Sequence, residues 1–384
     1  MKFFAKSRGR IGIAALAVAV FSISASAKTF VYVSNAEDGD ISTYMMTVDG
    51  ELQPGARVKA AQLVMPMVVS ADKRHLYAAS RSKPFSMHAY NIDRATGALT
   101  SLAVSPLAES FPYISIDKTG RFLFGASYGG NLISVNTIGK DGRVSAEPLQ
   151  TIPVGRNAHS IRTDQSNRFV YVPALGTDQI FQFMLNAKSG RLTANTPAVA
   201  LMKAGTGPRH FIISQDNNFL YALSEMLATV TTFSIDSKTG LLTEVSSATG
   251  LPPGTKLGPG APRAPVGVAN AAPPRNTDND IWAADIHMTP NGRFLYISER
   301  TDGMLAQFNI DAQTGKLTYI GSTPTEKQPR GFAIDGRGRF LIASGEKSET
   351  VSVYAIEQAT GALQFLQKYP VGKGANWVEI VDFD

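Results

Sequence analysis

Short apolar runs recur along the chain at a nearly constant spacing. Most of them follow a polar turn that contains Gly or Asn, and each begins at an aromatic or histidine position. The seven first positions are Phe30, His75, Phe122, Phe169, Phe219, Phe294 and Phe340. They are separated by 45, 47, 47, 50, 75 and 46 residues. Short apolar runs bounded by turns predict buried β-strands, and a repeat of about 40 to 50 residues is typical of propellers and solenoids.

Two further strands follow each run, and one precedes most of them. Segments such as YNIDRATGALT, FSIDSKTGLLT and YAIEQATGALQ each predict a strand, a turn around glycine and another strand. Segments such as PYISI, HFIIS and GFAID precede six of the seven runs. Each repeat therefore predicts a four-stranded antiparallel sheet.

The strand missing from the first repeat is found at the other end of the chain. NWVEIVDF at 376–383 is predicted to pair with TFVYVSN at 29–35. We therefore predict an all-β fold, a seven-bladed β-propeller of four-stranded antiparallel blades whose ring is closed by the C-terminal and N-terminal strands. A sandwich pair or a solenoid is disfavoured, because sandwiches do not repeat at this period and solenoid coils are usually shorter. Residues 28–384 would form this single domain.

The one irregular spacing indicates an insertion of about 25 residues within 251–280. This segment is rich in Pro, Gly and Ala, which disfavours a packed element. We expect a long loop that joins the last strand of one blade to the first strand of the next. It would fall on the rim that carries the chemistry and narrow the entrance there.

The first 27 residues have the pattern of a signal peptide. Four basic residues precede an apolar stretch from Ile11 to Ile23, and the segment ends in Ala25-Ser26-Ala27. We predict cleavage after Ala27, a periplasmic or secreted protein, and no stable insertion in a membrane, since the apolar stretch is short for a bilayer span.

Composition removes several classes of function. Without residues 1–27 the formal charge falls from +6 to +2, which gives no support for nucleic-acid binding. The chain has no cysteine, so disulfides, thiolate catalysis and thiolate metal sites are excluded. No GxSxG elbow precedes a helix and no glycine-rich phosphate loop opens one, which disfavours a serine hydrolase, a kinase and a Rossmann dehydrogenase.

Two positions of the repeat predict a functional rim. In a propeller, the starts of the first strands and the ends of the second strands lie on the same face. Ten residues before the first position of each run stand His159, Arg209 and Arg330, and six residues after it stand Arg81, Glu225, Arg300 and Glu346. Packing alone would favour apolar residues there. The charged residues therefore indicate either a binding site or salt bridges that hold blades together, for instance Arg300 with Glu225.

The histidines of three first strands are further candidates. His159, His210 and His287 are expected near the channel, whereas His75 and His88 have positions that indicate structural or exposed roles. The three come from different blades without the local pairing of known zinc motifs, and no loop has the dense Asp and Asn spacing of a calcium site. We predict no metal and no cofactor.

At these same residues the chain resembles a known family. GPRHFIISQDNNFLYALSE, WAADIHMTPNGRFLYISERT, QPRGFAIDGRGRFLIASGEKS and VGKGANWVEI are similar to the bacterial propeller-type 6-phosphogluconolactonases, over essentially the whole chain after residue 27. The fold of that family is a seven-bladed propeller. The wider family also resembles the fungal carboxymuconate-lactonizing enzymes, in which a His, two Arg and a Glu are implicated in lactone chemistry.

The resemblance assigns residues to this chemistry. It implies His159 of NAHS, Arg209 of GPRH, Glu225 of LSE and Arg300 of SERT as the catalytic set. The candidates for substrate binding are His210, His287, Arg330 and Arg81. His159 would be the general base, Arg209 or Arg300 would stabilise the oxyanion or clamp an anionic group, and Glu225 would orient an arginine or shuttle a proton.

The implied activity is that of a carboxylic ester hydrolase acting on a small sugar lactone, in a monomeric protein. Two substrates stay open, because the familiar enzymes are cytoplasmic and this chain has an export signal. One is 6-phosphoglucono-1,5-lactone and the other is an unphosphorylated aldonolactone such as glucono-1,5-lactone. Two alternative functions are a lactonizing isomerase and a non-catalytic scaffold that binds a protein or glycan, the latter with an exposed apolar patch on the rim.

Overall fold

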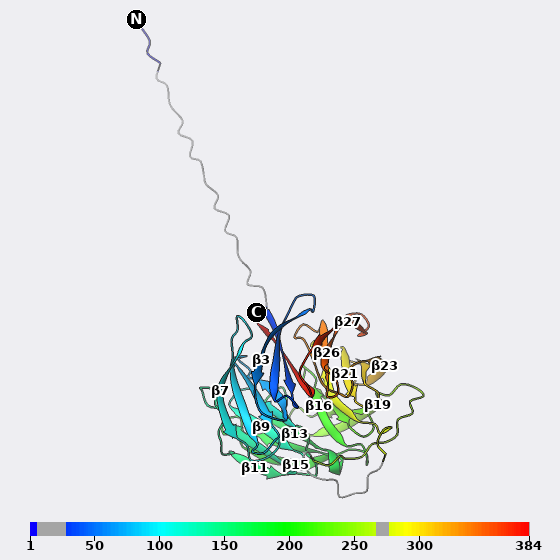
Figure 1. Ribbon diagram of the computed structural model, residues 1–384. Helices are drawn as coiled ribbons and strands as arrows, with labels where there is room; N and C mark the ends of the chain where they lie inside the picture. Colours follow the sequence, from blue (N-terminus) through cyan, green and yellow to red (C-terminus); the bar gives the residue numbers. More distant parts are fainter. Residues whose placement is uncertain (6–27, 266–275, 384) are drawn as a thin grey trace.

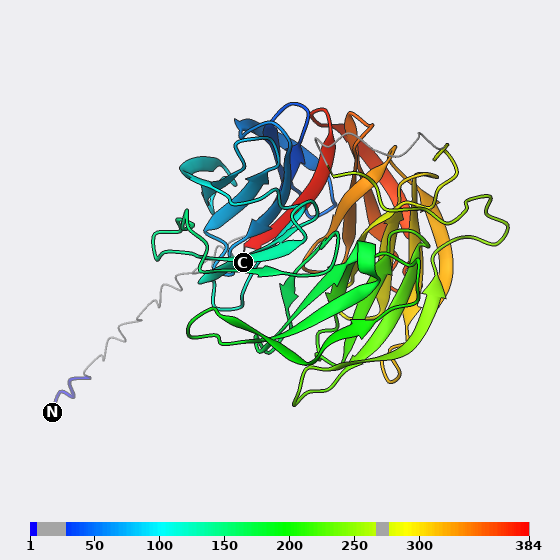
Figure 2. The ribbon, with the colours of Figure 1, turned by 90° about the horizontal axis from the view of Figure 1, so that it is seen from below.

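Seven four-stranded antiparallel sheets stand around a common axis in the computed structural model, which describes residues 1–5, 28–265 and 276–383 (Figures 1 and 2). This arrangement confirms the predicted seven-bladed propeller. Within the described parts of the chain, the one helical segment is the 3₁₀ turn η1 (Leu175–Thr177). The predicted signal peptide falls mostly outside the described residues. No helix in the described parts is long and apolar enough to cross a membrane.

The strands fall into four sets by their place in the blade. The innermost strands are β4 (Val64–Val69), β8 (Tyr113–Ile116), β12 (Arg162–Thr163), β16 (Pro208–Ile213), β20 (Ala283–Met288), β24 (Pro329–Ile334) and β28 (Ala375–Phe383). The second strands are β1 (Lys28–Asn35), β5 (His75–Ser80), β9 (Phe122–Ser127), β13 (Phe169–Ala174), β17 (Phe219–Ser224), β21 (Phe294–Glu299) and β25 (Phe340–Gly345).

The two outer sets complete each blade. The third strands are β2 (Asp40–Met46), β6 (Ser86–Ile92), β10 (Leu132–Thr137), β14 (Gln179–Leu185), β18 (Thr229–Ile235), β22 (Met304–Ile310) and β26 (Thr350–Ile356). The outermost strands are β3 (Leu52–Lys59), β7 (Leu99–Pro106), β11 (Gln150–Pro153), β15 (Leu192–Leu201), β19 (Leu242–Thr249), β23 (Leu317–Pro324) and β27 (Leu363–Pro370).

The ring closes as the sequence predicts. β28 pairs antiparallel with β1, with Lys28 opposite Phe383 and Val33 opposite Val378, so one blade is built from both ends of the chain. Figure 1 shows this as the red C-terminal strand beside the blue N-terminal one. One detail differs from expectation. The innermost strand of the fourth blade is only two residues long, and His159 lies before it, next to an isolated bridge between Ala158 and Ala174.

Neighbouring blades are joined by a contact between two features of the sequence repeat. Gly97, in the hairpin after β6, lies against the ring of Phe30 on β1, and a Cβ built on it would come within 2.3 Å of that ring. Its φ of +72° also requires glycine, and the hydroxyl of Tyr32 donates to its carbonyl over 2.9 Å. The corresponding pairs are His75 with Gly142, Phe122 with Gly190, Phe169 with Gly240, Phe219 with Gly315, Phe294 with Gly361 and Phe340 with Gly50. The recurring aromatic residue thus packs on the recurring glycine of the next blade.

Candidate active site

A polar pocket opens on the rim where the innermost strands begin and the second strands end. Its volume is about 460 Å³, including the space open to solvent at its mouth. Residues from six blades and from the insertion line it: Arg81, Pro112, Tyr128, His159, Glu225, Arg263, Ala264, Pro265, Trp282, Arg300 and Arg330. The structure therefore brings together five of the eight site residues predicted from the sequence, and we call this cavity the rim pocket.

Backbone bulges in the innermost strands aim the key side chains. In β16, Pro208 pairs with Ser224 and Phe211 with Ala222, so that Arg209 and His210 together face a single residue of β17. Such a bulge bends the strand and changes the direction of the side chains within it. Here Arg209 reaches Glu225 at the rim, while His210 lines the central channel. β20 carries the same irregularity between Ala283 and Ile286.

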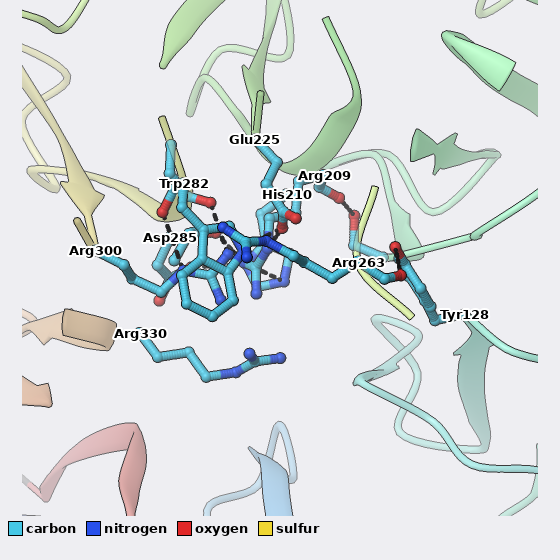
Figure 3. A network of polar contacts seen from close by, with 12 residues as sticks. Tyr128, Arg209, His210, Glu225, Arg263, Trp282, Asp285, Arg300 and Arg330 are labelled. Carbon is cyan, nitrogen blue, oxygen red and sulfur yellow. Dashed lines mark hydrogen bonds and ion pairs between the residues drawn. The ribbon is translucent and has the colours of Figure 1, made fainter. Parts of the chain in front are cut away.

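Glu225 joins two buried arginines at the floor of the rim pocket (Figure 3). Its Oε2 atom accepts hydrogen bonds from Nε of Arg209 at 2.7 Å and from Nη2 of Arg300 at 3.1 Å. Arg300 also donates through Nε to the carbonyl of Trp282. Arg209 is fully buried and does not line the pocket, whereas Glu225 and Arg300 do. One carboxylate therefore serves two guanidinium groups, which leaves an excess of positive charge.

Arg209 contacts His210, which in turn contacts Asp285. His210 and Asp285 occupy the same position of the repeat in neighbouring blades, and Nδ1 of His210 lies 2.9 Å from Oδ1 of Asp285. Nη1 of Arg209 lies 3.1 Å from Nε2 of His210 and also donates to the carbonyl of Ala284. Burial lowers the pKa of His210 to about 3. A neutral imidazole that donates from Nδ1 and accepts at Nε2 fits both partners.

His159 is almost fully buried but lines the rim pocket. Its ring meets Tyr128 and His210 edge to face, with centroids 5.6 and 5.2 Å away. Its Nδ1 atom has no hydrogen-bond partner among the described residues. Burial, reinforced by the positive charge of Arg209, lowers the pKa of His159 well below its ordinary value. The imidazole is therefore neutral at physiological pH, with an unused nitrogen.

Arg81 and Arg330 form another side of the pocket. Arg330 lies 3.5 Å from Glu346. Arg81 is 7% exposed, donates to the hydroxyl of Ser110 and contacts the sulfur of Met65. Burial and the nearby charge of Arg330 lower the pKa of Arg81 to about 9. The buried Arg81 guanidinium thus has only neutral hydrogen-bonding partners in the described chain.

The insertion reaches across the rim to the third blade. The hydroxyl of Tyr128 donates to the carbonyl of Arg263 at 2.8 Å, and a Cβ built on Gly129 would meet Pro265 at 3.3 Å. The guanidinium carbons of Arg263 and Arg300 lie 4.5 and 3.7 Å from the centroid of the Trp282 ring. Residues 263–265 of the predicted insertion therefore line the rim pocket. Residues 266–275 lie outside the described part of the chain.

A second cavity occupies the central channel and is lined by all seven innermost strands. His210 and His287 line this cavity and not the rim pocket, and both contact Asp285. Although burial alone would raise the pKa of Asp285, the two imidazoles hold it well below its ordinary value. Within the described residues no cluster of three or more His, Asp and Glu side chains could hold a metal ion.

Sequence reasoning missed Arg263, Trp282 and Asp285, and it did not single out Tyr128. Tyr128 stands six residues after Phe122 and so shares the repeat position of Arg81, Glu225 and Arg300. Asp285 shares the position of His210, nine residues before the aromatic anchor. Extending the repeat comparison by one position would have found it. Arg263 has no counterpart in other repeats, so only the fold could place it.

Comparison with known proteins agrees with the fold. Residues 25–380 match the family described as "Lactonase, 7-bladed beta-propeller". The chain is 39% identical over 355 residues to a 6-phosphogluconolactonase of Pectobacterium carotovorum, which covers 92% of this chain and 99% of that protein. It is 39% identical over 354 residues to a 6-phosphogluconolactonase of Serratia proteamaculans, with 92% of this chain and 99% of that one covered.

Solved structures match over most of their length. A protein of Bacteroides fragilis superposes with a TM-score of 0.80 and 24% identity, covering 94% of this chain and 99% of its own. The periplasmic gluconolactonase of Pseudomonas aeruginosa superposes with a TM-score of 0.78 and 23% identity, covering 93% and 99%. At these identities the likeness speaks for the fold.

Proposed function

The chain belongs to the lactonase family of seven-bladed β-propellers, and on that premise we propose that it hydrolyses the lactone of a sugar acid at the rim pocket. The curated relatives at 39% identity are 6-phosphogluconolactonases and match over almost their full length. The observation that carries the assignment to the pocket is the neutral His159, which lines the same cavity as the Glu225–Arg300 pair and whose buried Nδ1 has no hydrogen-bond partner among the described residues.

The proposed reaction needs a base, an oxyanion site and an acid. A water molecule attacks the lactone carbonyl while His159 accepts its proton. The negative charge that develops on the carbonyl oxygen is stabilised by Arg300. Collapse of the tetrahedral intermediate breaks the ring C–O bond, and the imidazolium returns its proton to the leaving alkoxide. The product is the open hydroxy acid, with all atoms of water accounted for.

Arg209 has a different role in this proposal from that of Arg300. Its donors are directed to Glu225, His210 and Ala284, and it is fully buried beneath the pocket. It acts as a positioning residue that fixes Glu225, which in turn orients Arg300. His287 lies in the channel cavity, so we assign it no contact with the substrate.

Export is part of the proposal. The pattern of residues 1–27 is that of an export signal. Outside the cytoplasm, an unphosphorylated aldonolactone is a candidate substrate beside 6-phosphoglucono-1,5-lactone. The scaffold alternative has less support, since arginines and aromatic residues line the rim pocket. The exposed apolar side chains of the outermost strands are instead distributed around the circumference: Val104, Leu201, Val245, Ile320, Phe365 and Leu366.

Hydrolysis of both lactones by the protein lacking residues 1–27, corrected for spontaneous ring opening, tests the function. We expect acceleration of one or both, and a loss of about a hundredfold in kcat/KM for His159→Ala, because a general base contributes roughly that factor. His88→Ala serves as the control, since His88 lies on β6 outside both cavities. The proposal fails if neither lactone opens faster than in buffer. An active His159→Ala variant would remove the histidine from the mechanism alone.

A further inference from the structure

We propose that Arg263, delivered by the insertion, acts with Arg81 as a selectivity pair for lactones that carry an additional anionic group. The inference rests on the proposed lactone hydrolysis and adds the class of substrate. The anionic group is a phosphate or a carboxylate, remote from the ring carbonyl. The argument has three steps, which concern the charge of Arg81, the placement of Arg263 and the charge balance of the rim pocket.

Arg81 is a buried charge that has no carboxylate among its described hydrogen-bond partners, although the charge of Glu346 acts on it from nearby. It is 7% exposed, and its described partners are the Ser110 hydroxyl and the Met65 sulfur. A buried guanidinium is costly unless it is paired, and its fork of donors matches phosphate and carboxylate oxygens. Because Arg81 lines the rim pocket, an anion bound there would supply the missing partner.

Arg263 is held in place by contacts with three blades. Gly260, three residues earlier, donates from its backbone nitrogen to the carbonyl of Met226 on the fifth blade. The bond from Tyr128 fixes the Arg263 carbonyl on the third blade, and Trp282 supports the guanidinium at the start of the sixth (Figure 3). Nη2 forms an ion pair with Asp280 over 3.5 Å, and Nε is buried without a hydrogen-bond partner among the described residues. This is a preorganised donor at the pocket wall.

The pocket as a whole has more cations than anions. Four arginines line it (Arg81, Arg263, Arg300 and Arg330), against the single carboxylate of Glu225, which also serves the buried Arg209. Glu346 and Asp280 do not line the pocket but form ion pairs with Arg330 and Arg263 at 3.5 Å, so the surplus is that of Arg81, Arg209 and Arg300 over Glu225. Such a surplus favours a substrate whose own charge completes the balance.

Three lactones distinguish the effect of substrate charge on kcat/KM from effects on ring opening itself. Glucono-1,5-lactone has no charged group, 6-phosphoglucono-1,5-lactone adds a phosphate, and glucaro-1,5-lactone adds a carboxylate. For Arg263→Ala we expect kcat/KM for a charged lactone to fall at least about tenfold more than kcat/KM for the uncharged one, because a charged contact at the pocket wall is lost. The larger fall identifies which anionic group is recognised. Arg81→Met should shift the ratio in the same direction.

Two further variants separate a lost contact from a lost fold. Arg293→Ala removes another arginine that lies over an aromatic ring, 5.1 Å from the Phe294 centroid, but it lies outside the rim pocket and should preserve the ratio. Tyr128→Phe removes the bond to the Arg263 carbonyl and should lower the ratio partially. Equal losses for charged and uncharged lactones in Arg263→Ala would overturn the proposal.

A binding measurement keeps the inference separate from the proposed activity. Calorimetry with 6-phosphogluconate and gluconate compares two product acids that differ by one phosphate. We expect wild type to prefer 6-phosphogluconate, and Arg263→Ala to lose about tenfold of that preference. If the wild type prefers 6-phosphogluconate and Arg263→Ala loses this preference, but no lactone is hydrolysed, the proposed function fails while the anion selectivity stands. If no preference exists in the wild type and Arg263→Ala changes no selectivity ratio, the anion selectivity is wrong.

Discussion

Nε of Arg209 donates to Oε2 of Glu225 over 2.7 Å, with the two side chains only 1% and 5% exposed. Removal of Arg209 takes one of two guanidinium partners from Glu225 and leaves the carbonyl of Ala284 and Nε2 of His210 without this buried donor. We therefore expect Arg209→Met to lower the free energy of unfolding by about 3–5 kcal/mol, measured by guanidinium denaturation. Arg57→Met is the control, because Arg57 is 48% exposed in its ion pairs with Asp38 and Asp40, and it should cost less than about 1 kcal/mol. Equal stability of Arg209→Met and wild type would contradict this interpretation.

The pH dependence of hydrolysis follows from the lowered pKa of His159. A base whose pKa is lowered is unprotonated throughout the neutral range, and it loses activity only when the pH falls into the acid range. We expect kcat/KM to be level between about pH 6 and 8, after subtraction of spontaneous ring opening. A rise in kcat/KM centred near pH 6.5, the ordinary value for histidine, would show that the imidazole titrates normally.

Glu379 on β28 gives a second pH-dependent property. Burial raises its pKa to about 7, and its described hydrogen bond comes from the indole of Trp377. The folded state therefore holds a proton that the unfolded state releases near pH 4.5, so the contribution of Glu379 to stability falls as the pH rises from 4.5 to 7. Glu379→Gln should be more stable than wild type above pH 7, by up to about 3 kcal/mol, with the difference vanishing below pH 4.5. Denaturation midpoints at pH 4 and 8 test this, and a difference that is equal at both pH values would refute it.

Two glycines with nearly equal φ angles test how much the contact between blades contributes to stability. Gly240 has φ +72° and lies against the ring of Phe169, where a Cβ would come within 2.3 Å. Gly120 has φ +71° with no atom within 4 Å of its Cβ position. Gly120→Ala should cost about 1 kcal/mol for backbone strain, and Gly240→Ala at least about 2 kcal/mol more, because the ring must also move. Equal thermal shifts for the two variants would show that the packing contributes nothing.

The repeat of apolar runs was sufficient to predict the blades, because each strand is specified by a short apolar run and each turn by the glycine or asparagine within it. It also predicted the closing pair of β28 and β1, since one innermost strand was missing from the count. The same register brought His159, Glu225, Arg300, Arg81 and Arg330 to one pocket. Equivalent positions in a ring of repeats lie at the same height, whatever their separation in sequence.

Other features of the site depend on geometry that no local pattern specifies. Arg209, which reaches the rim, and its neighbour His210, which reaches the channel, both lie within a bulge of β16. His287 lines the channel, near which the sequence analysis expected it, and not the rim pocket where it was a candidate for substrate binding. Arg263 depends on where the insertion crosses, which Tyr128 determines through a contact across blades. Side-chain direction at a bulge and the path of a non-repeating loop are therefore what the sequence analysis lacked.

The pairing of Lys28 with Phe383 has a consequence for how the chain reaches its native state. Six blades are built from consecutive residues, whereas the sheet of β28, β1, β2 and β3 needs both ends. The entropic cost of bringing these two ends together becomes smaller once the intervening blades have folded and shortened the distance between them. The ring of blades therefore cannot close in a growing polypeptide until residues 375–383 are available to pair with β1. Until then β1 has no strand partner on one side and exposes an edge on which a second copy could dock.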